Sequence, residues 1–244
     1  MVVDAQFPES AQNCISGLED MGNASFDILI NTHHHGDHTA GNSAFENRVQ
    51  KIVAHQNVPD LQQAAAERNG QEALNAQVYP DTTYTDSWST EVGDETVRLT
   101  HYGPAHTAGD TVVYFEKANV IHMGELVFNR AHPFIDRGSG ASISNWIITL
   151  ETVMDEYPGN AIYIFGHGNS EYGITGTKDD LGVMRDFLTA LTEYTQKGIS
   201  EGKSLDELKA VETLNGFEEF KAPGWRLPLS ANIEVAYAEL TEEN

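Results

Sequence analysis

The sequence predicts an α/β layered domain, and three observations predict it. Segments typical of strands and of helices alternate in the first and last thirds of the chain, with hairpin-like segments between them. With 244 residues and 40% hydrophobic side chains, the chain is long and apolar enough to bury a large core. No internal repeat and no Pro/Gly/Ser-rich linker divides it, so we expect residues 1–244 to form one domain.

The N-terminal part of the chain alternates strand and helix. Phe26–Asn31 is a short apolar run typical of a buried strand, and Val49–Ala54 predicts a second strand. Between them, Gly41–Phe45 indicates the start of a helix. Val58–Gln77 is rich in Ala, Gln, Glu and Leu, which favours a helix that breaks near Asn69-Gly70.

The sequence of the middle of the chain predicts β-hairpins. Thr90–Tyr102 predicts one hairpin, with its turn at Gly93-Asp94. Thr111–Phe115 and Asn119–Met123 predict two more strands, joined by a tight turn around Lys117-Ala118.

Helices return in the C-terminal part. Ser142–Tyr157 is amphipathic, and the apolar run Ala161–Phe165 after it predicts a strand. Thr177–Lys197 predicts a long helix with leucines on one face. Ser204–Val211 predicts a short helix with acidic residues in its first turn, where the helix dipole favours them.

Composition excludes several classes of function. The 14 Lys and Arg residues against 37 Asp and Glu give a net charge of −23, so a nuclease or a binder of anionic membranes is not expected. The alternative interpretation of this acidity is a solvated shell that keeps the protein in solution. Cys14 is the only cysteine, which rules out an intrachain disulfide and a zinc site built of thiolates.

Two further features concern the compartment. No apolar run approaches the roughly 18–20 residues that a bilayer span needs, so we expect a soluble protein. The chain starts Met1-Val2-Val3-Asp4 without the basic and apolar stretches of a signal peptide, which leaves the cytoplasm and the periplasm both open.

The strongest chemical signal is a histidine cluster directly after the strand at 26–31. In an extended segment His33 and His35 project to the same side, so they can chelate one divalent ion, while Asp37 and His38 at the following turn can bind a second. His34 would face away from them. A surface accident or an expression tag is the alternative, but tags lie at chain ends. Imidazole and carboxylate without sulfur suit zinc, and also iron or manganese.

Two more histidines have a similar setting. His106 lies in a Gly/Pro-rich turn between two strands, and His167 lies between two glycines after the strand at 161–165. Four other histidines lack such a signature: His55, His101, His122 and His132. His122 and His132 bracket a candidate site loop, which makes them the better candidates for substrate contact.

Taken together, these motifs resemble the metallo-β-lactamase fold superfamily. The resemblance is carried by His33-x-His35-x-Asp37-His38 with Thr39-Ala40-Gly41-Asn42, by Pro104-Ala105-His106-Thr107-Ala108-Gly109-Asp110, and by His167, in the family's order. It implies a four-layer αββα sandwich. It also implies that one metal is held by His33, His35 and His106 and a second by Asp37, His38 and His167, with Asp4 as an acid behind the ligands. The stretch from Gly124 through Asp136 is similar to zinc metallohydrolases of the quinoprotein relay group.

The sequence departs from the family pattern at two places. Where many members have an aspartate that bridges both metals, this chain has Glu125, which is one methylene longer and could bridge or swing out. Several strands normally precede the first motif, yet only three residues precede Asp4. We therefore expect a first sheet that is short on its N-terminal side, with its edge covered by a second copy in a homo-oligomer or by a rearranged segment.

The resemblance implies a metal-dependent hydrolase in which a metal-bound hydroxide attacks a small ester, thioester, lactone or β-lactam, with Asp37 orienting the nucleophile. One or two zinc ions are expected. Two alternatives remain open on the same fold: an iron-dependent persulfide dioxygenase, and a degenerate member that binds metal without catalysis.

Overall fold

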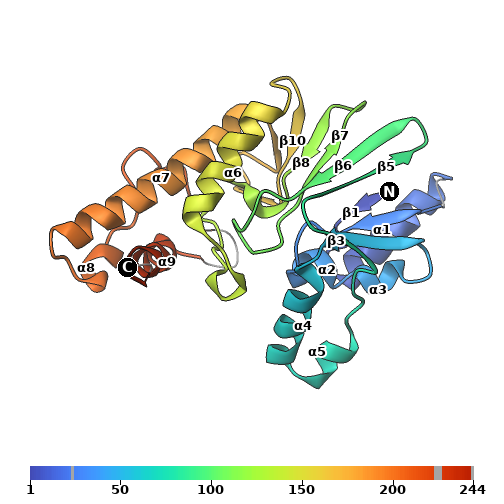
Figure 1. Ribbon diagram of the computed structural model, residues 1–244, viewed down its shortest axis with the longest axis horizontal. Coiled ribbons are helices and arrows are strands. Elements are labelled where there is room, and N and C mark those ends of the chain that lie inside the picture. The colour runs from blue at the N-terminus through green and yellow to red at the C-terminus, as the bar shows by residue number, and fades with distance from the viewer. Residues whose placement is uncertain (23–24, 223–226, 243–244) are drawn as a thin grey trace. The chain divides into compact units, whose positions relative to one another are not determined.

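The computed structural model describes residues 1–22, 25–222 and 227–242, and Figure 1 shows its helices and strands. The chain divides into two compact units. Unit 1 comprises Met1–Tyr102 with Gly109–Val113, and unit 2 comprises Gly103–Ala108 with Tyr114–Asn244. The single domain expected for the whole chain stays a prediction.

Unit 1 is built on a parallel sheet of four strands in the order β1-β2-β3-β4, with every neighbouring pair parallel. The strands are β1 (Val2–Val3), β2 (Ile28–Ile30), β3 (Lys51–His55) and β4 (Thr82–Tyr84). The strands expected at 26–31 and 49–54 are confirmed as β2 and β3. All three residues of β2 are buried, which explains why its sequence is continuously apolar and does not alternate between apolar and polar residues.

Helices and one hairpin complete unit 1. The helices are α1 (Pro8–Asp20), α2 (Gly36–Thr39), α3 (Asn42–Phe45), α4 (Val58–Asn69) and α5 (Gln71–Asn75). Gly70 separates α4 from α5 with a φ of 95°, so the break predicted near Asn69-Gly70 is confirmed. The predicted hairpin is confirmed as the antiparallel pair β5 (Ser87–Val92) and β6 (Glu95–Thr100).

The core under α1 has a simple origin in the sequence. Ala11 and Ile15 are spaced one helical turn apart and are the two buried residues of α1. They pack in one cluster with Phe26, Leu29 and Phe45. This cluster fixes the strand β2, whose carboxyl end carries the histidine motif, against the helices that flank it.

Unit 2 contains short strands that pair across long sequence separations. β8 (Val120–His122) is parallel to β10 (Ile162–Ile164), which is antiparallel to β12 (Thr175–Gly176). β9 (Phe128–Asn129) is parallel to β11 (His167–Gly168). The remaining strand, β7 (Val112–Phe115), is where the chain passes from unit 1 to unit 2.

Four α-helices and two short 3₁₀ turns complete the described part of unit 2. They are η1 (Gly124–Leu126), η2 (Arg137–Ser139), α6 (Ile143–Glu156), α7 (Lys178–Ser200), α8 (Leu205–Lys209) and α9 (Leu229–Glu242). α6, α7 and α8 confirm the three predicted C-terminal helices. Trp146 of α6 is fully buried, and its Nε1–H donates to the Leu126 carbonyl at 2.9 Å, which ties α6 to η1.

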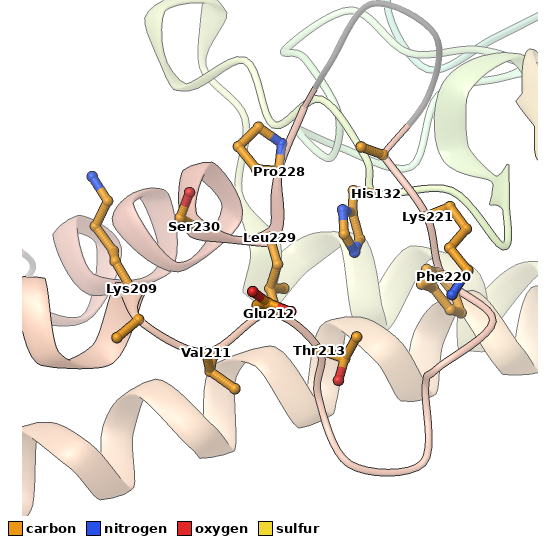
Figure 2. A pocket seen from close by; sticks show the side chains of 12 residues that line it. His132, Lys209, Val211, Glu212, Thr213, Phe220, Lys221, Pro228, Leu229 and Ser230 are labelled. Carbon is orange, nitrogen blue, oxygen red and sulfur yellow. The ribbon is translucent and has the colours of Figure 1, made fainter.

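Unit 2 also contains a cavity of about 530 Å³ near the C-terminus, lined by His132 together with residues 209–213, 220–222 and 228–230 (Figure 2). Among the described residues, no helix combines the length and the apolar character that crossing a membrane would require.

Candidate metal centre

The carboxyl end of β2 positions the histidine motif. After Ile30 the chain stays buried through Asn31, Thr32 and His33. Asn31 and Asn42 exchange two side-chain amide hydrogen bonds, 3.0 and 2.9 Å long, which join the strand end to α3. A buried pair that satisfies both amides holds the intervening loop in one conformation.

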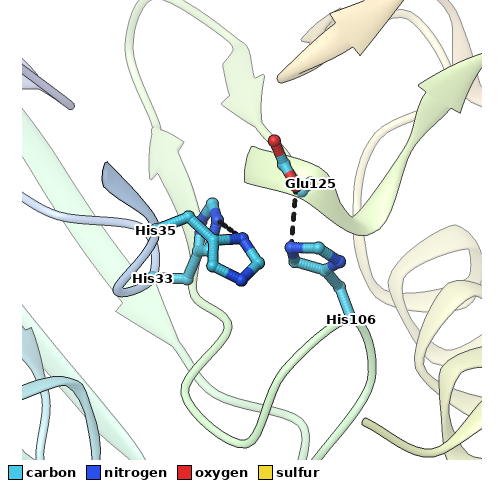
Figure 3. A group of neighbouring side chains, drawn as sticks. All are labelled: His33, His35, His106 and Glu125. Carbon is cyan, nitrogen blue, oxygen red and sulfur yellow. Dashed lines mark hydrogen bonds and ion pairs between the residues drawn. The ribbon is translucent and has the colours of Figure 1, made fainter. Parts of the chain in front are cut away.

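Four predicted ligands from this loop come together within unit 1. His33 Nε2 lies 3.0 Å from His35 Nδ1, and Figure 3 shows this contact. The rings of His33 and His38 have their centroids 4.2 Å apart, and His38 Nε2 lies 3.7 Å from Asp37 Oδ2. The side chains that the sequence pairs as chelators, His33 with His35 and Asp37 with His38, are therefore adjacent.

Asp4 lies behind this group and orients it. One of its carboxylate oxygens accepts from the Thr32 backbone N–H at 2.7 Å. The other oxygen lies 2.7 Å from His38 Nδ1 and accepts from the Thr32 hydroxyl at 2.8 Å. Because His38 Nδ1–H donates to this carboxylate, Nε2 of His38 carries the lone pair, on the side of Asp37.

The predicted ligands of unit 2 converge on Glu125. His106 Nε2 lies 2.7 Å from Glu125 Oε2, as Figure 3 shows, and His167 Nε2 contacts the other oxygen, Oε1. Glu125 is 4% exposed and His106 is fully buried. One carboxylate thus offers a separate oxygen to each of two imidazoles that come from positions far apart in the sequence.

A backbone carbonyl orients His106. Its Nδ1–H donates to the Phe134 carbonyl at 2.7 Å, so Nε2 is the nitrogen that faces Glu125. Sequence reasoning did not find this partner, since any residue carries a carbonyl. It also did not find the hydroxyl of Thr32, which lies 3.1 Å from His33 Nδ1. Thr32 directly precedes the histidine motif in the sequence, and this position could have suggested it as a partner of His33.

The other histidines lie in different surroundings. His122 of β8 accepts from the Gly124 N–H at 3.1 Å and so supports the turn that leads to Glu125. His132 lines the C-terminal cavity of unit 2. His55 and His101 stack on each other in unit 1, with ring centroids 3.8 Å apart. A substrate contact by His122 or His132 stays a prediction.

Comparison with known proteins identifies the family. The model of the metallo-beta-lactamase superfamily matches residues 1–213. A curated relative, the "Metallo-beta-lactamase type 2" of Bacteroides fragilis, is 24% identical over 161 residues, which are 66% of this chain and 60% of that protein. The chain therefore matches less than two thirds of the length of this relative.

Two solved structures share the fold. A metallo-beta-lactamase from Pontibacter korlensis superimposes with a TM-score of 0.63 and 19% identity, over 77% of this chain and 81% of that one. A stereoselective inverting sec-alkylsulfatase from Pseudomonas sp. reaches a TM-score of 0.74 at 14% identity, over 98% of this chain and 45% of the other. The mixed α/β fold is thus the metallo-β-lactamase sandwich that the sequence predicted, and the chain belongs to the metallo-β-lactamase superfamily.

Proposed function

We propose that the protein is a metal-dependent hydrolase with two metal ions. His33, His35 and His106 would hold the first ion, Asp37, His38 and His167 would hold the second, and the Glu125 carboxylate would be available to both. The observation that carries the proposal is the buried Glu125 carboxylate, which gives one oxygen to His106 and the other to His167. These two histidines belong to different predicted ligand sets, so a carboxylate that reaches both has the arrangement that a bridge requires.

The donor groups fit such ions. Each unit gathers imidazole and carboxylate groups that offer ligand atoms, and neither set includes sulfur. This chemistry suits zinc and also iron or manganese. Asp4 and the Phe134 carbonyl hold His38 and His106 by their Nδ1 atoms, which leaves Nε2 for a metal.

When bound, the metal ions would lower the pKa of a water molecule toward neutrality and polarise the carbonyl or similar group under attack. Asp37 is about one-third exposed on the first turn of α2, so its carboxylate can orient that water and accept its proton. Asp4 keeps His38 in place during the reaction through their hydrogen bond.

We propose small electrophiles as substrates: esters, thioesters, lactones and β-lactams. The net charge of −23 favours neutral substrates over polyanions. Secondary alkyl sulfates belong in the same screen, because a sec-alkylsulfatase shares the fold over 98% of this chain.

Metal content and hydrolysis test the proposal together. We expect two ions per chain by elemental analysis and hydrolysis of at least one chromogenic substrate class that a chelator abolishes. Asp37→Asn and Glu125→Gln should each lose an ion and fall to the activity of the chelated protein. Asp60→Asn is the matched control for Asp37→Asn, because Asp60 lies in the first turn of α4 and is exposed; it should change neither quantity. Unchanged metal content in Asp37→Asn and Glu125→Gln would contradict the ligand set.

The same measurements separate the alternatives. Iron in the purified protein, with consumption of oxygen in the presence of a glutathione persulfide, would favour the dioxygenase. Metal binding without turnover of any substrate in the screen would favour the non-catalytic member of the family.

A further inference from the structure

None of the residues that line the C-terminal cavity of unit 2 is assigned to the metals. Half of its lining comes from residues 220–222 and 228–230, which lie beyond residue 213, where the match to the family ends. Its volume of about 530 Å³ is large enough for a small organic molecule. Binding of a ligand in this cavity can therefore be inferred from the residues that line it, without the metal ions proposed above.

One side of the cavity favours an anion. The first turn of α9 supplies Leu229 and Ser230 to the lining. The Ala231 N–H in this turn donates to the Pro228 carbonyl, whereas the first N–H groups of a helix have no acceptors within it. This turn contains no acidic residue. Lys221 adds a positive charge: its ammonium donates to the Glu218 carbonyl and forms no ion pair within the described residues. The charge of Lys209 is already compensated, because its ammonium pairs with Glu234.

A buried histidine supplies a directed polar group. His132 is 5% exposed, and its Nδ1–H donates to the Leu227 carbonyl at 3.1 Å. Burial lowers the pKa of this imidazole and nearby Lys221 lowers it further, against the carbonyl hydrogen bond, so the ring is neutral near pH 7. Nε2 therefore carries a lone pair, and it has no hydrogen bond within the described part of the chain. Figure 2 shows the ring among the side chains that line the cavity.

Apolar side chains form the rest of the wall. Phe220 and Leu229 are buried, and Val211 and Pro228 add carbon surface to the same cavity. Glu212 also lines the cavity; its side chain and that of Lys221 are both exposed, so solvent screens both charges. Lys221 also lies near the Glu218 carboxylate, whose pKa its charge helps to lower after the hydrogen bonds to backbone N–H groups.

We propose that this cavity binds a small hydroxycarboxylate with a short alkyl chain. The carboxylate lies at the N-terminus of α9 beside Lys221, the hydroxyl donates to Nε2 of His132, and the alkyl chain lies on Phe220 and Leu229. An anion without a hydroxyl leaves Nε2 without a donor, and a neutral diol leaves Lys221 and the helix terminus without a negative charge.

Three probes of equal chain length test this assignment: 2-hydroxyhexanoate, hexanoate and 1,2-hexanediol, each titrated by isothermal calorimetry or NMR into the full chain. We expect saturable binding of 2-hydroxyhexanoate with a Kd of roughly millimolar size, as for a ligand with few atoms. Hexanoate should bind about three- to tenfold more weakly for lack of one hydrogen bond, and the diol more weakly still. Absence of saturable binding of 2-hydroxyhexanoate would overturn the proposal.

Variants locate the site. Lys221→Gln should weaken binding of 2-hydroxyhexanoate by about three- to tenfold. Lys203→Gln removes the same charge from an exposed lysine outside the cavity and should leave binding unchanged. His132→Asn keeps a donor for the Leu227 carbonyl and removes Nε2, so it should abolish the preference for 2-hydroxyhexanoate over hexanoate. Binding that His35→Ala abolishes and Lys221→Gln leaves intact would place the ligand elsewhere and refute the assignment.

Discussion

Three of the five candidate histidine ligands have an oxygen atom as partner at Nδ1. Thr32 Oγ1 takes this role for His33, Asp4 for His38 and the Phe134 carbonyl for His106. In each case Nε2 is the nitrogen left for a metal, and the ring direction is set before any ion arrives. Because the rings do not have to be ordered on binding, their conformational entropy does not reduce the affinity for the metal.

The sequence could predict the ligands, and the family resemblance implied Asp4 as an acid behind them, but Thr32 and the Phe134 carbonyl were not predicted. Histidine and aspartate residues that directly follow predicted strands form a recognisable motif. The sequence therefore predicted the side chains that the structure places next to Glu125 and next to His38. That Asp4 contacts His38, 34 residues away, is seen only in the structure, and Phe134 acts through its backbone, which leaves no mark on residue type. Such partners follow from the three-dimensional course of the chain.

The stacked pair His55 and His101 predicts a pH dependence of stability. Burial, together with the neighbouring His101, lowers the pKa of His55 to about 4, against the opposing effects of the hydrogen bond to Thr85 and the charge of Asp86. The pair also contacts the Tyr84 ring, which lies against His55, and the Asp110 carbonyl, which accepts from His101 Nδ1–H. Between about pH 6.5 and pH 4, His55 is protonated in the unfolded chain and neutral in the folded chain. The free energy of unfolding therefore falls as the pH falls toward 4.

We expect this one group to lower the free energy of unfolding by roughly 2–3 kcal/mol between pH 7 and pH 4. Urea unfolding of the wild type and of His55→Phe measures it, since phenylalanine retains the ring stack and cannot titrate. The difference between their pH profiles isolates His55 from the carboxylates, which titrate in both proteins. Parallel profiles for the two proteins would show that His55 does not cause the dependence.

At the scale of elements, one glycine joins the strand β1 to the helices of the histidine motif. The Ala5 N–H donates to the His38 carbonyl at 2.8 Å, and the Gly41 N–H donates to the Gln6 carbonyl at 2.6 Å. A Cβ atom at Gly41 would lie 2.2 Å from the Ala5 carbonyl oxygen. The backbone segments therefore pack so closely that only glycine fits at position 41.

Gly41→Ala should accordingly destabilise the protein by about 2 kcal/mol or more, because the obstructing atom belongs to the backbone and cannot swing away. Gly17→Ala is the matched control: Gly17 lies inside α1 with nothing within 4 Å of an added Cβ, and alanine there should stabilise by about 0.5–1 kcal/mol. Thermal and urea unfolding measure both. A Gly41→Ala protein as stable as wild type would mean that the two segments can separate without cost.

Prediction of elements succeeded where the hydrophobic pattern was strong. The buried strand β2 and the amphipathic α6 follow from apolar runs and from three- and four-residue spacing. No pattern in the sequence predicted the helices α1 (Pro8–Asp20) and α9 (Leu229–Glu242). α1 buries only Ala11 and Ile15, so its apolar face is too narrow to stand out, although Pro8 at its first position was an available signal.

At the scale of the molecule, charge is the dominant property that composition sets. The 14 basic residues can pair with at most 14 of the 37 acidic ones, which leaves at least 23 carboxylates without a cation. Exposed pairs such as Arg48 with Glu19 add little, since such contacts are worth about 0–1 kcal/mol. The hypothesis that a second copy covers the edge strand β1 stays a prediction, and the same repulsion would oppose association of two copies.

Added salt should therefore stabilise this protein. Two effects compete: salt weakens the surface ion pairs, and it screens the repulsion among carboxylates held closer together in the folded chain than in the unfolded one. Because the unpaired carboxylates outnumber the basic residues, we expect screening to prevail. The free energy of unfolding in urea should rise by on the order of 1 kcal/mol as NaCl increases from about 20 mM to about 500 mM.

Neutralising exposed acids by Asp60→Asn together with Glu72→Gln should reduce this rise, because fewer charges then need screening. A stability that falls with salt would mean that the ion pairs, rather than the excess of carboxylates, control the electrostatics of the folded chain.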